Sequence, residues 1–166
     1  VVQSIIPSIR RKIITYGMSF QADVRAENIS YDNIHTTFDV IYRNRHLGSI
    51  TMDMPGEHNI ANALACCAVC LELEIPFAQI QEGLNGFTGV DRRFSIRDTI
   101  SHEEGEITII DDYGHHPVEI EATLSAAAQA WPNRRILAIC QPHRYTRVQE
   151  QFSEFCRCFN RASLLY

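Results

Sequence analysis

The sequence predicts an α/β fold, with a β-rich first part and a second part built on largely parallel strands. Short apolar runs that alternate with polar residues fill the first 54 positions and are typical of strands. After residue 105, a strand pattern, a polar loop and a helix pattern follow one another twice. That succession predicts a parallel pair joined by a right-handed crossover. With 45% hydrophobic residues in 166, the chain can form a proper core.

The first part is predicted to contain two strands followed by a hairpin. Lys12–Tyr16 is a short strand ended by Gly17, and Ala22–Ile29 is the second candidate. Residues 38–42 and 47–52 alternate across an Arg-Asn-Arg-His turn at 43–46, which indicates a β-hairpin.

Two helices are predicted next, and then a domain boundary. A Pro-Gly turn leads into an apolar helix at Ile60–Leu73, and a second helix starts at Ile75–Pro76 and continues through Leu84. The glycine-containing segment 85–89 breaks this pattern. We therefore expect two domains, at residues 1–91 and 92–166.

The second part is predicted to hold two strands, a helix, a strand, a helix and the start of a further strand. Ser95–Asp98 and Glu106–Ile110 are strands joined by an acidic turn at 102–105, and Arg135–Cys140 is a buried strand. The helices are indicated by apolar residues at helical spacing: Ile120, Leu124, Ala127 and Trp131 after Pro117, and then Val148, Phe152, Phe155 and Phe159.

Two polar loops follow the predicted parallel strands, and they carry the most chemistry. Residues 111–117 read Asp-Asp-Tyr-Gly-His-His-Pro, and residues 141–147 read Gln-Pro-His-Arg-Tyr-Thr-Arg. In open α/β sheets, ligands bind at the carboxyl ends of the strands. We therefore predict that the two loops share one pocket for anions; the alternative is that each loop is a solvated turn. The residues expected in this pocket are His115, His116, Arg144 and Arg147.

Two further groups are candidates for binding a nucleotide. His58, Asn59 and Asn62 can approach one face of the first helix, where amides could hydrogen-bond the edge of a planar base. The alternative is that Asn59 merely caps the helix. Arg92 and Arg93 could hold a phosphate, or they could be an ordinary surface pair.

Composition excludes several classes of protein. A formal net charge of −5 argues against a general nucleic-acid binder, and no stretch approaches the roughly 20 apolar residues of a membrane span. Cys156 and Cys158 lack CxxC spacing and no second pair completes a zinc pattern, which favours free thiols in a reducing cytoplasm. Zinc at His115, His116 and His143 is disfavoured, because adjacent histidines on one loop point in different directions.

The ends suggest a piece of a longer protein. Val1 is not an initiator methionine, and the last residues, 164–166, stop within a predicted strand. The first eleven residues also lack the order of charge, apolar core and cleavage site that marks a signal peptide.

With these motifs in place, the chain resembles the Mur ligases of peptidoglycan synthesis. The matching segments occur in the family's order over nearly the whole chain, and the two polar loops are the most specific of them. The matches are Thr15–Gly17, Pro55–Ala65, Gly89–Phe94, Asp111–Pro117 with Glu119, and Gln141–Arg147.

The resemblance implies a domain order and an activity. Residues 1–91 would be the end of a central ATPase domain, and 92–166 part of a Rossmann-like carboxyl-terminal domain with a largely parallel sheet. The family's glycine-rich phosphate loop and its Mg²⁺-binding Glu and His do not occur in this sequence, so we expect the chain alone to be inactive. The implied reaction is cytoplasmic and uses ATP and Mg²⁺ to join a carboxylate to an amine through an acyl phosphate. The loop motifs best fit UDP-N-acetylmuramate and L-alanine as substrates.

The resemblance also assigns roles to individual residues. His58, Asn59 and Asn62 would contact the adenine, and Arg93 the ATP phosphates. Asp112, with Asp111 beside it, would accept hydrogen bonds from the ribose. Tyr113 and His115 would face the muramoyl and acyl-phosphate end, which makes His115 and Arg93 the expected catalytic residues. Arg144 and Arg147 would hold the alanine carboxylate, and closure of the two domains would assemble the site.

Two alternatives remain open from the sequence. One is the related ligase that recycles a murein tripeptide onto the same sugar nucleotide, which shares the His-His-Pro motif. The other is a non-catalytic nucleotide-binding module of a fused protein, which the missing phosphate loop would suit.

Overall fold

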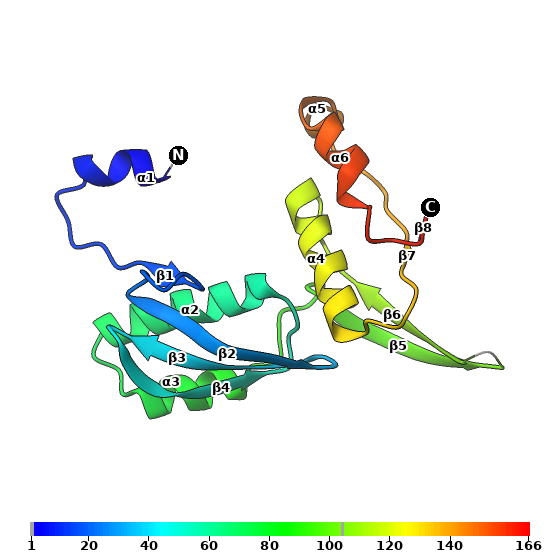
Figure 1. Ribbon diagram of the computed structural model, residues 1–166. Helices are drawn as coiled ribbons and strands as arrows, with labels where there is room; N and C mark the ends of the chain where they lie inside the picture. Colours follow the sequence, from blue (N-terminus) through cyan, green and yellow to red (C-terminus); the bar gives the residue numbers. More distant parts are fainter. Residues whose placement is uncertain (1, 104) are drawn as a thin grey trace.

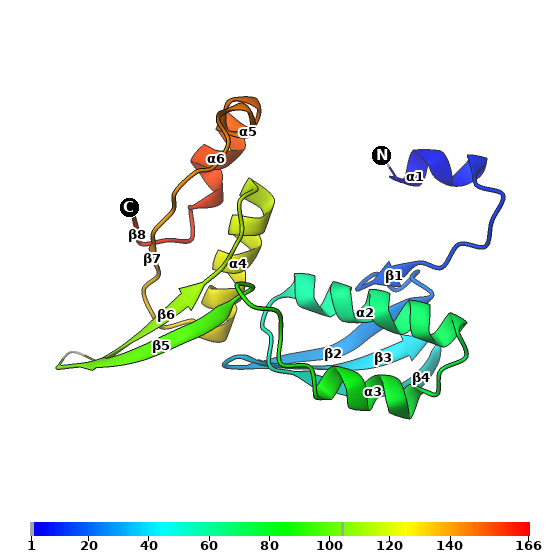
Figure 2. The same cartoon turned by 180° about the vertical axis from the view of Figure 1, so that it is seen from behind.

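The computed structural model describes residues 2–103 and 105–166, which form two units joined by a short connection (Figure 1). The first unit holds a four-stranded sheet and two helices. The second holds a long hairpin, one long helix, two short helices and a small parallel strand pair. The view from behind shows the same division, with the amino-terminal helix α1 (Val2–Ile5) standing away from the sheet (Figure 2).

The sheet of the first unit runs in the order β1-β2-β3-β4. Its strands are β1 (Tyr16–Gly17), β2 (Val24–Asp32), β3 (His35–Tyr42) and β4 (Arg45–Met52). The predicted hairpin is confirmed, with a tight turn at Arg43 and Asn44, which both have positive φ. The first predicted strand is shorter than expected, because only Tyr16 and Gly17 pair with β2, in parallel. A single turn of 3₁₀-helix at Ile6–Ser8 lies between α1 and β1.

Two helices complete the first unit and enclose its core. The helix α2 (Glu57–Glu72) packs against β1 and β2, and α3 (Phe77–Asn85) packs against β4. Both helices are confirmed, although α2 begins three residues before the predicted start. Alternate residues of the strands point inward, and Phe38, Val40 and Ile50 are fully buried against the helices. This apolar burial stabilises the scaffold that holds the start of α2.

The second unit begins with an antiparallel hairpin of β5 (Ser95–His102) and β6 (Gly105–Asp111). Both predicted strands are confirmed and are longer than expected; Glu104, in the predicted acidic turn, lies outside the described residues. The helix α4 (Pro117–Ala130) follows as predicted, with Ile120, Leu124 and Ala127 buried. One face of α4 packs near Phe94, whose ring stacks on that of Trp131 at 6.2 Å.

The predicted pairing of the parallel strands is wrong in one respect. We expected strand 107–110 to pair with strand 135–140. In the part of the chain that the structure describes, β6 pairs only with β5, and β7 (Leu137–Ala138) pairs in parallel with β8 (Leu164–Leu165). The chain thus contains a mixed α/β architecture of small sheets, and the parallel relation holds for the last pair.

The helix predicted after residue 145 is also divided. It forms α5 (Tyr145–Glu150) and α6 (Phe152–Cys158), because Gln151, with a φ of −123°, interrupts the helical conformation. Phe155 is buried against Ile120 and Leu124 of α4. Phe152 is 64% exposed, so the predicted apolar stripe is not continuous.

No helix in the described residues is long and apolar enough to cross a membrane.

Candidate functional site

A cleft of about 960 Å³ lies between the two units, which is near the upper end of the size range of small-molecule sites. Helices α2 and α3 form one wall, and the other wall consists of residues 90–94 and the first turns of α4. Apolar residues of both units, including Met52, Phe87 and Phe94, line its floor and sides. The polar and charged residues around it include His58, Asn59, Asn62, Arg93, Asp112 and Glu119.

The start of α2 positions the first group of candidate residues. Gly56 is the N-cap, with a φ of +103° that favours glycine. The helix then places His58, Asn59 and Asn62 within its first two turns. All three predicted residues line the cleft.

Asn59 has a structural contact in addition to its place in the cleft. Its side-chain amide donates to the carbonyl of Pro55 at 2.8 Å, and the residue is 7% exposed. The alternative that Asn59 is the N-cap is wrong, because Gly56 occupies that position. The bond fixes the amide group and uses one of its two N–H donors.

The connection between the units is clasped by the carboxylate of Asp112. One oxygen of this carboxylate accepts from the backbone N–H of Phe94 at 2.8 Å, and the other from that of Gly114 at 2.7 Å. The backbone N–H of Tyr113 also donates to the carbonyl of Arg92 at 2.7 Å. Arg92 and Phe94 have φ values of +57° and +51°, a conformation that costs non-glycine residues roughly 1–2 kcal/mol each. The clasp therefore holds a strained connection in place.

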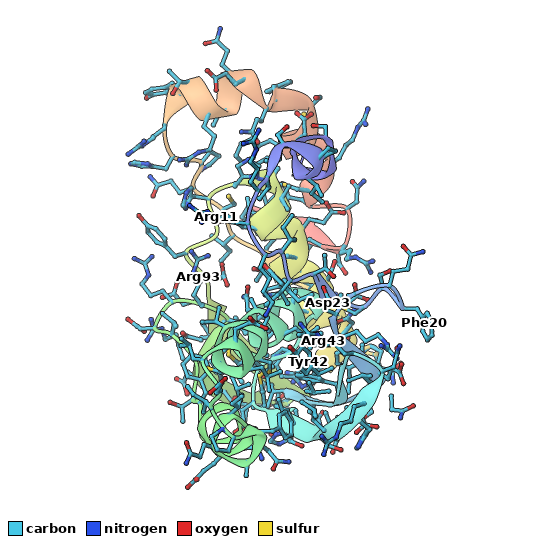
Figure 3. All side chains as sticks on the ribbon, turned by 90° about the vertical axis from the view of Figure 1, so that its left-hand side faces the viewer. Arg11, Phe20, Asp23, Tyr42, Arg43 and Arg93 are labelled. Atoms are coloured by element: carbon cyan, nitrogen blue, oxygen red, sulfur yellow. The ribbon has the colours of Figure 1, made fainter. Side chains whose placement is uncertain are left out.

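Arg93 extends the charged part of the cleft towards α4. Its guanidinium lies 3.8 Å from the carboxylate of Glu119, and Figure 3 shows Arg93 at the level where the two units meet. Glu119 in turn accepts from the backbone N–H groups of His115 at 2.9 Å and His116 at 3.2 Å. Arg93 thus lines the cleft beside the same carboxylate that orders the histidine loop.

Asp111 is directed away from this arrangement. Its carboxylate accepts from Arg97 at 2.9 Å and lies 3.3 Å from Arg92. The hydrogen bond from Arg97 and the nearby charge of Arg92 lower the pKa of Asp111. Asp111 is not among the residues that line the cleft, so its predicted place beside Asp112 in a nucleotide site is not reproduced.

His58 is the titratable group that both units influence. Desolvation in the cleft lowers the pKa of His58; the positive charge of Arg93 lowers it further, and the negative charge of Asp112 partly offsets both effects. The ring keeps an exposed edge towards the cleft. His58 is therefore neutral at neutral pH and can accept a hydrogen bond there.

We expect His58 to titrate below the ordinary histidine value of about 6.5, as followed by NMR of its ring proton. The pKa of His58 is lower in the folded protein than in the unfolded chain. The stability contributed by neutral His58 is therefore fully present above the unfolded pKa, and it is lost as the pH falls through the folded pKa. The variant Arg93→Gln should raise the pKa of His58, and Asp112→Asn should lower it. A His58 pKa that neither variant moves would show that the two units do not meet at this ring.

The two polar loops lie side by side, and their histidines and arginines lie outside the cleft. The guanidinium of Arg147 reaches the backbone carbonyls of His115 and His143, each at 3.4 Å, so the loops are adjacent. The ring nitrogen of His116 accepts from the backbone N–H of Val118 at 3.3 Å and caps α4. None of the four residues expected in the shared anion pocket, His115, His116, Arg144 and Arg147, lines the cleft.

The two loops also hold aromatic contacts around Tyr113 and a strained backbone position at Arg144. The ring of His115 lies edge-on to that of Tyr113, with 5.4 Å between ring centres, and Nδ1 of His115 is 3.1 Å from the carbonyl of Tyr113. Arg92 stacks over Tyr113 at 4.9 Å. Arg144 precedes α5 with a φ of +68°, a strained position of the kind that gathers at functional sites.

Several lining residues were not predicted. Val118, Ala122 and Thr123 of α4 line the cleft, and Phe94 forms part of its wall at the connection. Their types are ordinary for a core, so no sequence signal separated them from packing residues. The exception is Glu119, whose position three residues after His116 resembles the spacing of a capping box.

Comparisons with known proteins identify both units. The Mur ligase middle domain matches residues 2–70, and the Mur ligase glutamate ligase domain matches residues 92–166. A UDP-N-acetylmuramate–L-alanine ligase from Trichlorobacter lovleyi is 51% identical over 164 residues, which is 99% of this chain and 35% of that protein. The corresponding ligase from Salinibacter ruber is 48% identical, with 99% and 34% covered.

Solved structures agree with these matches. A UDP-N-acetylmuramate–alanine ligase from Thermotoga maritima has a TM-score of 0.76 at 31% identity, covering 92% of this chain and 33% of that one. A murein peptide ligase from Psychrobacter arcticus has a TM-score of 0.52 at 28% identity, covering 78% and 26%. The chain spans about a third of the length of the curated relatives it matches. By its sequence, its two units and these matches, the chain belongs to the Mur ligase family.

Proposed function

We propose that this chain is part of an ATP-dependent ligase that joins L-alanine to UDP-N-acetylmuramate in the cytoplasm, during peptidoglycan synthesis. The observation that carries the proposal is the cleft between the units. It brings His58, Asn59 and Asn62 of α2 together with Arg93 and Asp112 of the second unit. Relatives about 50% identical over nearly the whole chain bear the name of this ligase.

The cleft suits a nucleotide with its base at α2. The amides of Asn59 and Asn62 offer donors and acceptors to the edge of a planar base, and the neutral ring of His58 adds an acceptor or an apolar surface. The mostly apolar walls exclude water around the base. The carboxylate of Asp112 also lines the cleft. Two of its lone pairs accept from backbone N–H groups, and the remaining lone pairs can accept hydrogen bonds from ribose hydroxyls.

Arg93 is the residue assigned to the phosphates. It comes from the strained connection and lines the cleft beside Glu119. A bound phosphate would compete with Glu119 for the guanidinium. Phosphoryl transfer depends mainly on positioning and on neutralising charge, and Arg93 supplies a fixed positive charge for both.

The family implies Mg²⁺ beside the ATP phosphates. Within the described residues, no group of three or more His, Cys, Asp or Glu side chains could hold a metal ion. Mg²⁺ usually keeps several waters and binds phosphate oxygens through one or two carboxylates.

The acceptor end of the reaction is assigned to the two polar loops. The carboxylate of the sugar nucleotide is a poor electrophile, and phosphorylation to an acyl phosphate activates it for attack by the amine of L-alanine. Tyr113 and His115 stand next to Asp112 and face this end. Arg144 and Arg147 lie on the adjacent loop, where a planar guanidinium can hold the alanine carboxylate.

The remainder of the architecture is part of the same proposal. Residues 1–91 belong to the central ATPase domain and 92–166 to a Rossmann-like domain. In the complete domain, β6 and β7 would lie in one largely parallel sheet. The exposed apolar side chains of both strands, including Ile107, Ile109 and Leu137, support this arrangement.

The test is phosphate release by the full-length protein that contains this chain. With ATP and UDP-N-acetylmuramate present, release should depend on L-alanine. The tripeptide that a murein peptide ligase would use should be a much poorer substrate. Release that depends on the tripeptide instead would transfer the proposal to that ligase, and release that needs neither would contradict both.

Replacing Arg144 with alanine in the full-length protein should raise the KM for L-alanine much more than the KM for ATP. Losing a buried charged contact typically costs about 2–5 kcal/mol, which corresponds to an increase of well over tenfold. Arg157→Ala, on α6, is the control and should change neither constant. Equal increases for L-alanine and ATP would refute the assignment of Arg144.

A further inference from the structure

Two cysteines on one face of α2 form a close pair in the wall of the cleft. The sulfur atoms of Cys66 and Cys70 are 3.9 Å apart, and both residues line the cleft. Cys66 is exposed, and Cys70 is partly exposed. Cys67 points the other way and is fully buried in the core of the first unit. Neither Cys66 nor Cys70 has a role in the proposed reaction.

The spacing of this pair disfavours a disulfide. Residues four apart on a helix have their Cβ atoms about 5–6 Å apart, whereas a disulfide needs a Cβ separation of about 3.5–4.5 Å. Closing the bond would therefore distort α2 within the wall of the cleft. Both sulfurs are free thiols in the structure.

The same spacing suits a single atom that bonds both sulfurs. Metal–sulfur bonds of about 2.3 Å in tetrahedral geometry place two sulfurs roughly 3.8 Å apart, and the observed separation is 3.9 Å. At the narrower angle of about 100° that pyramidal arsenic(III) prefers, bonds of about the same length bring the sulfurs to roughly 3.5 Å. The observed pair is therefore a few tenths of an ångström from a two-sulfur chelate, a distance that side-chain rotation can close. Because the described residues offer no third His, Cys, Asp or Glu ligand at this position, the centre must bring the remainder of its own coordination shell.

We propose that Cys66 and Cys70 form a dithiol site that binds one trivalent organoarsenical. Arsenic(III) that carries one carbon substituent takes two thiols and needs no further protein ligand. In the reaction, two S–H bonds break and two As–S bonds form. The oxide oxygen leaves as water with the two thiol protons, and the oxidation state of arsenic does not change.

The environment of the Cys66 thiol disfavours simple alkylation. Burial raises the pKa of the Cys66 thiol, and the neighbouring Cys70 raises it further. Alkylating agents react with the thiolate, so Cys66 should react slowly with iodoacetamide at neutral pH. Condensation with an arsenic oxide releases the two thiol protons in water and gains from chelation by two sulfurs, so it should proceed on the same protein.

The experiment uses phenylarsine oxide and the full-length protein. One equivalent should raise the mass of the protein by that of one phenylarsenic group minus two hydrogen atoms. Peptide mapping should place the adduct on the peptide that contains α2. It should survive an excess of a monothiol such as 2-mercaptoethanol and be removed by 2,3-dimercaptopropanol. This pattern distinguishes a chelate from attachment through one sulfur.

The variants Cys66→Ala and Cys70→Ala should each weaken retention by about 10²-fold, the order of gain that a second linked contact provides. Cys66→Ser and Cys70→Ser should do the same while keeping a polar side chain in the wall. Cys156→Ala, which removes an exposed cysteine of α6, is the control and should leave retention unchanged. An adduct that survives the loss of Cys70, or that a monothiol removes from the unaltered protein, would overturn the proposal. Neither result depends on whether the cleft binds ATP.

Discussion

Replacing Gly56 with alanine is expected to destabilise the protein by about 2–5 kcal/mol, through backbone strain and overpacking together. Gly56 is the N-cap of α2 and has a φ of +103°. A Cβ at this position would lie 2.8 Å from the ring of His58 and 2.9 Å from Cβ of Ala126 on α4. The substitution would therefore push α4 away from α2 and move the His58 ring.

Equilibrium denaturation of the full-length protein measures this effect, and the dissociation constant for ATP measures its consequence in the cleft. Gly83→Ala is a matched control, because Gly83 lines the cleft but lies within α3, with no atom near its added Cβ. It should stabilise by about 0.5–1 kcal/mol, since alanine is the better helix former. Equal results for the two variants would show that the close contact between the units at Gly56 does not exist in solution.

Replacing Asp112 with alanine is expected to loosen the connection between the units and to weaken ATP binding. Two backbone N–H groups, those of Phe94 and Gly114, would lose their acceptor. A donor left unsatisfied costs about 1–3 kcal/mol, so the second unit should lose roughly 2–4 kcal/mol of stability. Amide hydrogen exchange at Phe94 and Gly114 should speed up correspondingly, because each amide is protected by this one carboxylate.

Two further variants separate the clasp from general charge effects. Asp112→Asn keeps one side-chain oxygen as acceptor and should retain only part of the protection. Asp111→Ala removes an equal charge, but its partners are the exposed Arg97 and Arg92. Surface ion pairs contribute little, so this variant should leave exchange at Phe94 and Gly114 unchanged. Similar exchange in the Asp111 and Asp112 variants would contradict the clasp.

Local patterns were enough to predict most elements of the fold. The alternation of residues 38–52 and the apolar stripe of α4 are properties of the neighbouring sequence, and both structures form as expected. The pairing of β7 and the division of α5 from α6 were missed. Both depend on contacts made at a distance or on a single backbone angle at Gln151, which periodicity does not encode.

The candidate site was predictable in part. Its residue types were readable because amides, an imidazole and a guanidinium occur at turns where packing does not require them. The sequence gives no sign that the carboxylate of Asp112 is bonded to the backbone of Phe94, because that contact joins positions 18 residues apart. It likewise does not separate Asp112, which enters the cleft, from Asp111, which turns to Arg97. That choice is made by the end of β6, where successive side chains point to opposite faces.

The central proposal is that one ATP molecule contacts both units across the cleft. Calorimetric titration of ATP into the full-length protein and into the variants Asn62→Ala and Arg93→Ala tests it most directly. Hydrogen bonds to charged groups contribute about 1.5–3 kcal/mol, so Arg93→Ala should weaken binding by at least about tenfold. Asn62→Ala, on the opposite wall, should weaken it by a smaller but measurable factor. An unchanged dissociation constant in either variant would place the nucleotide against one unit alone and contradict the proposal.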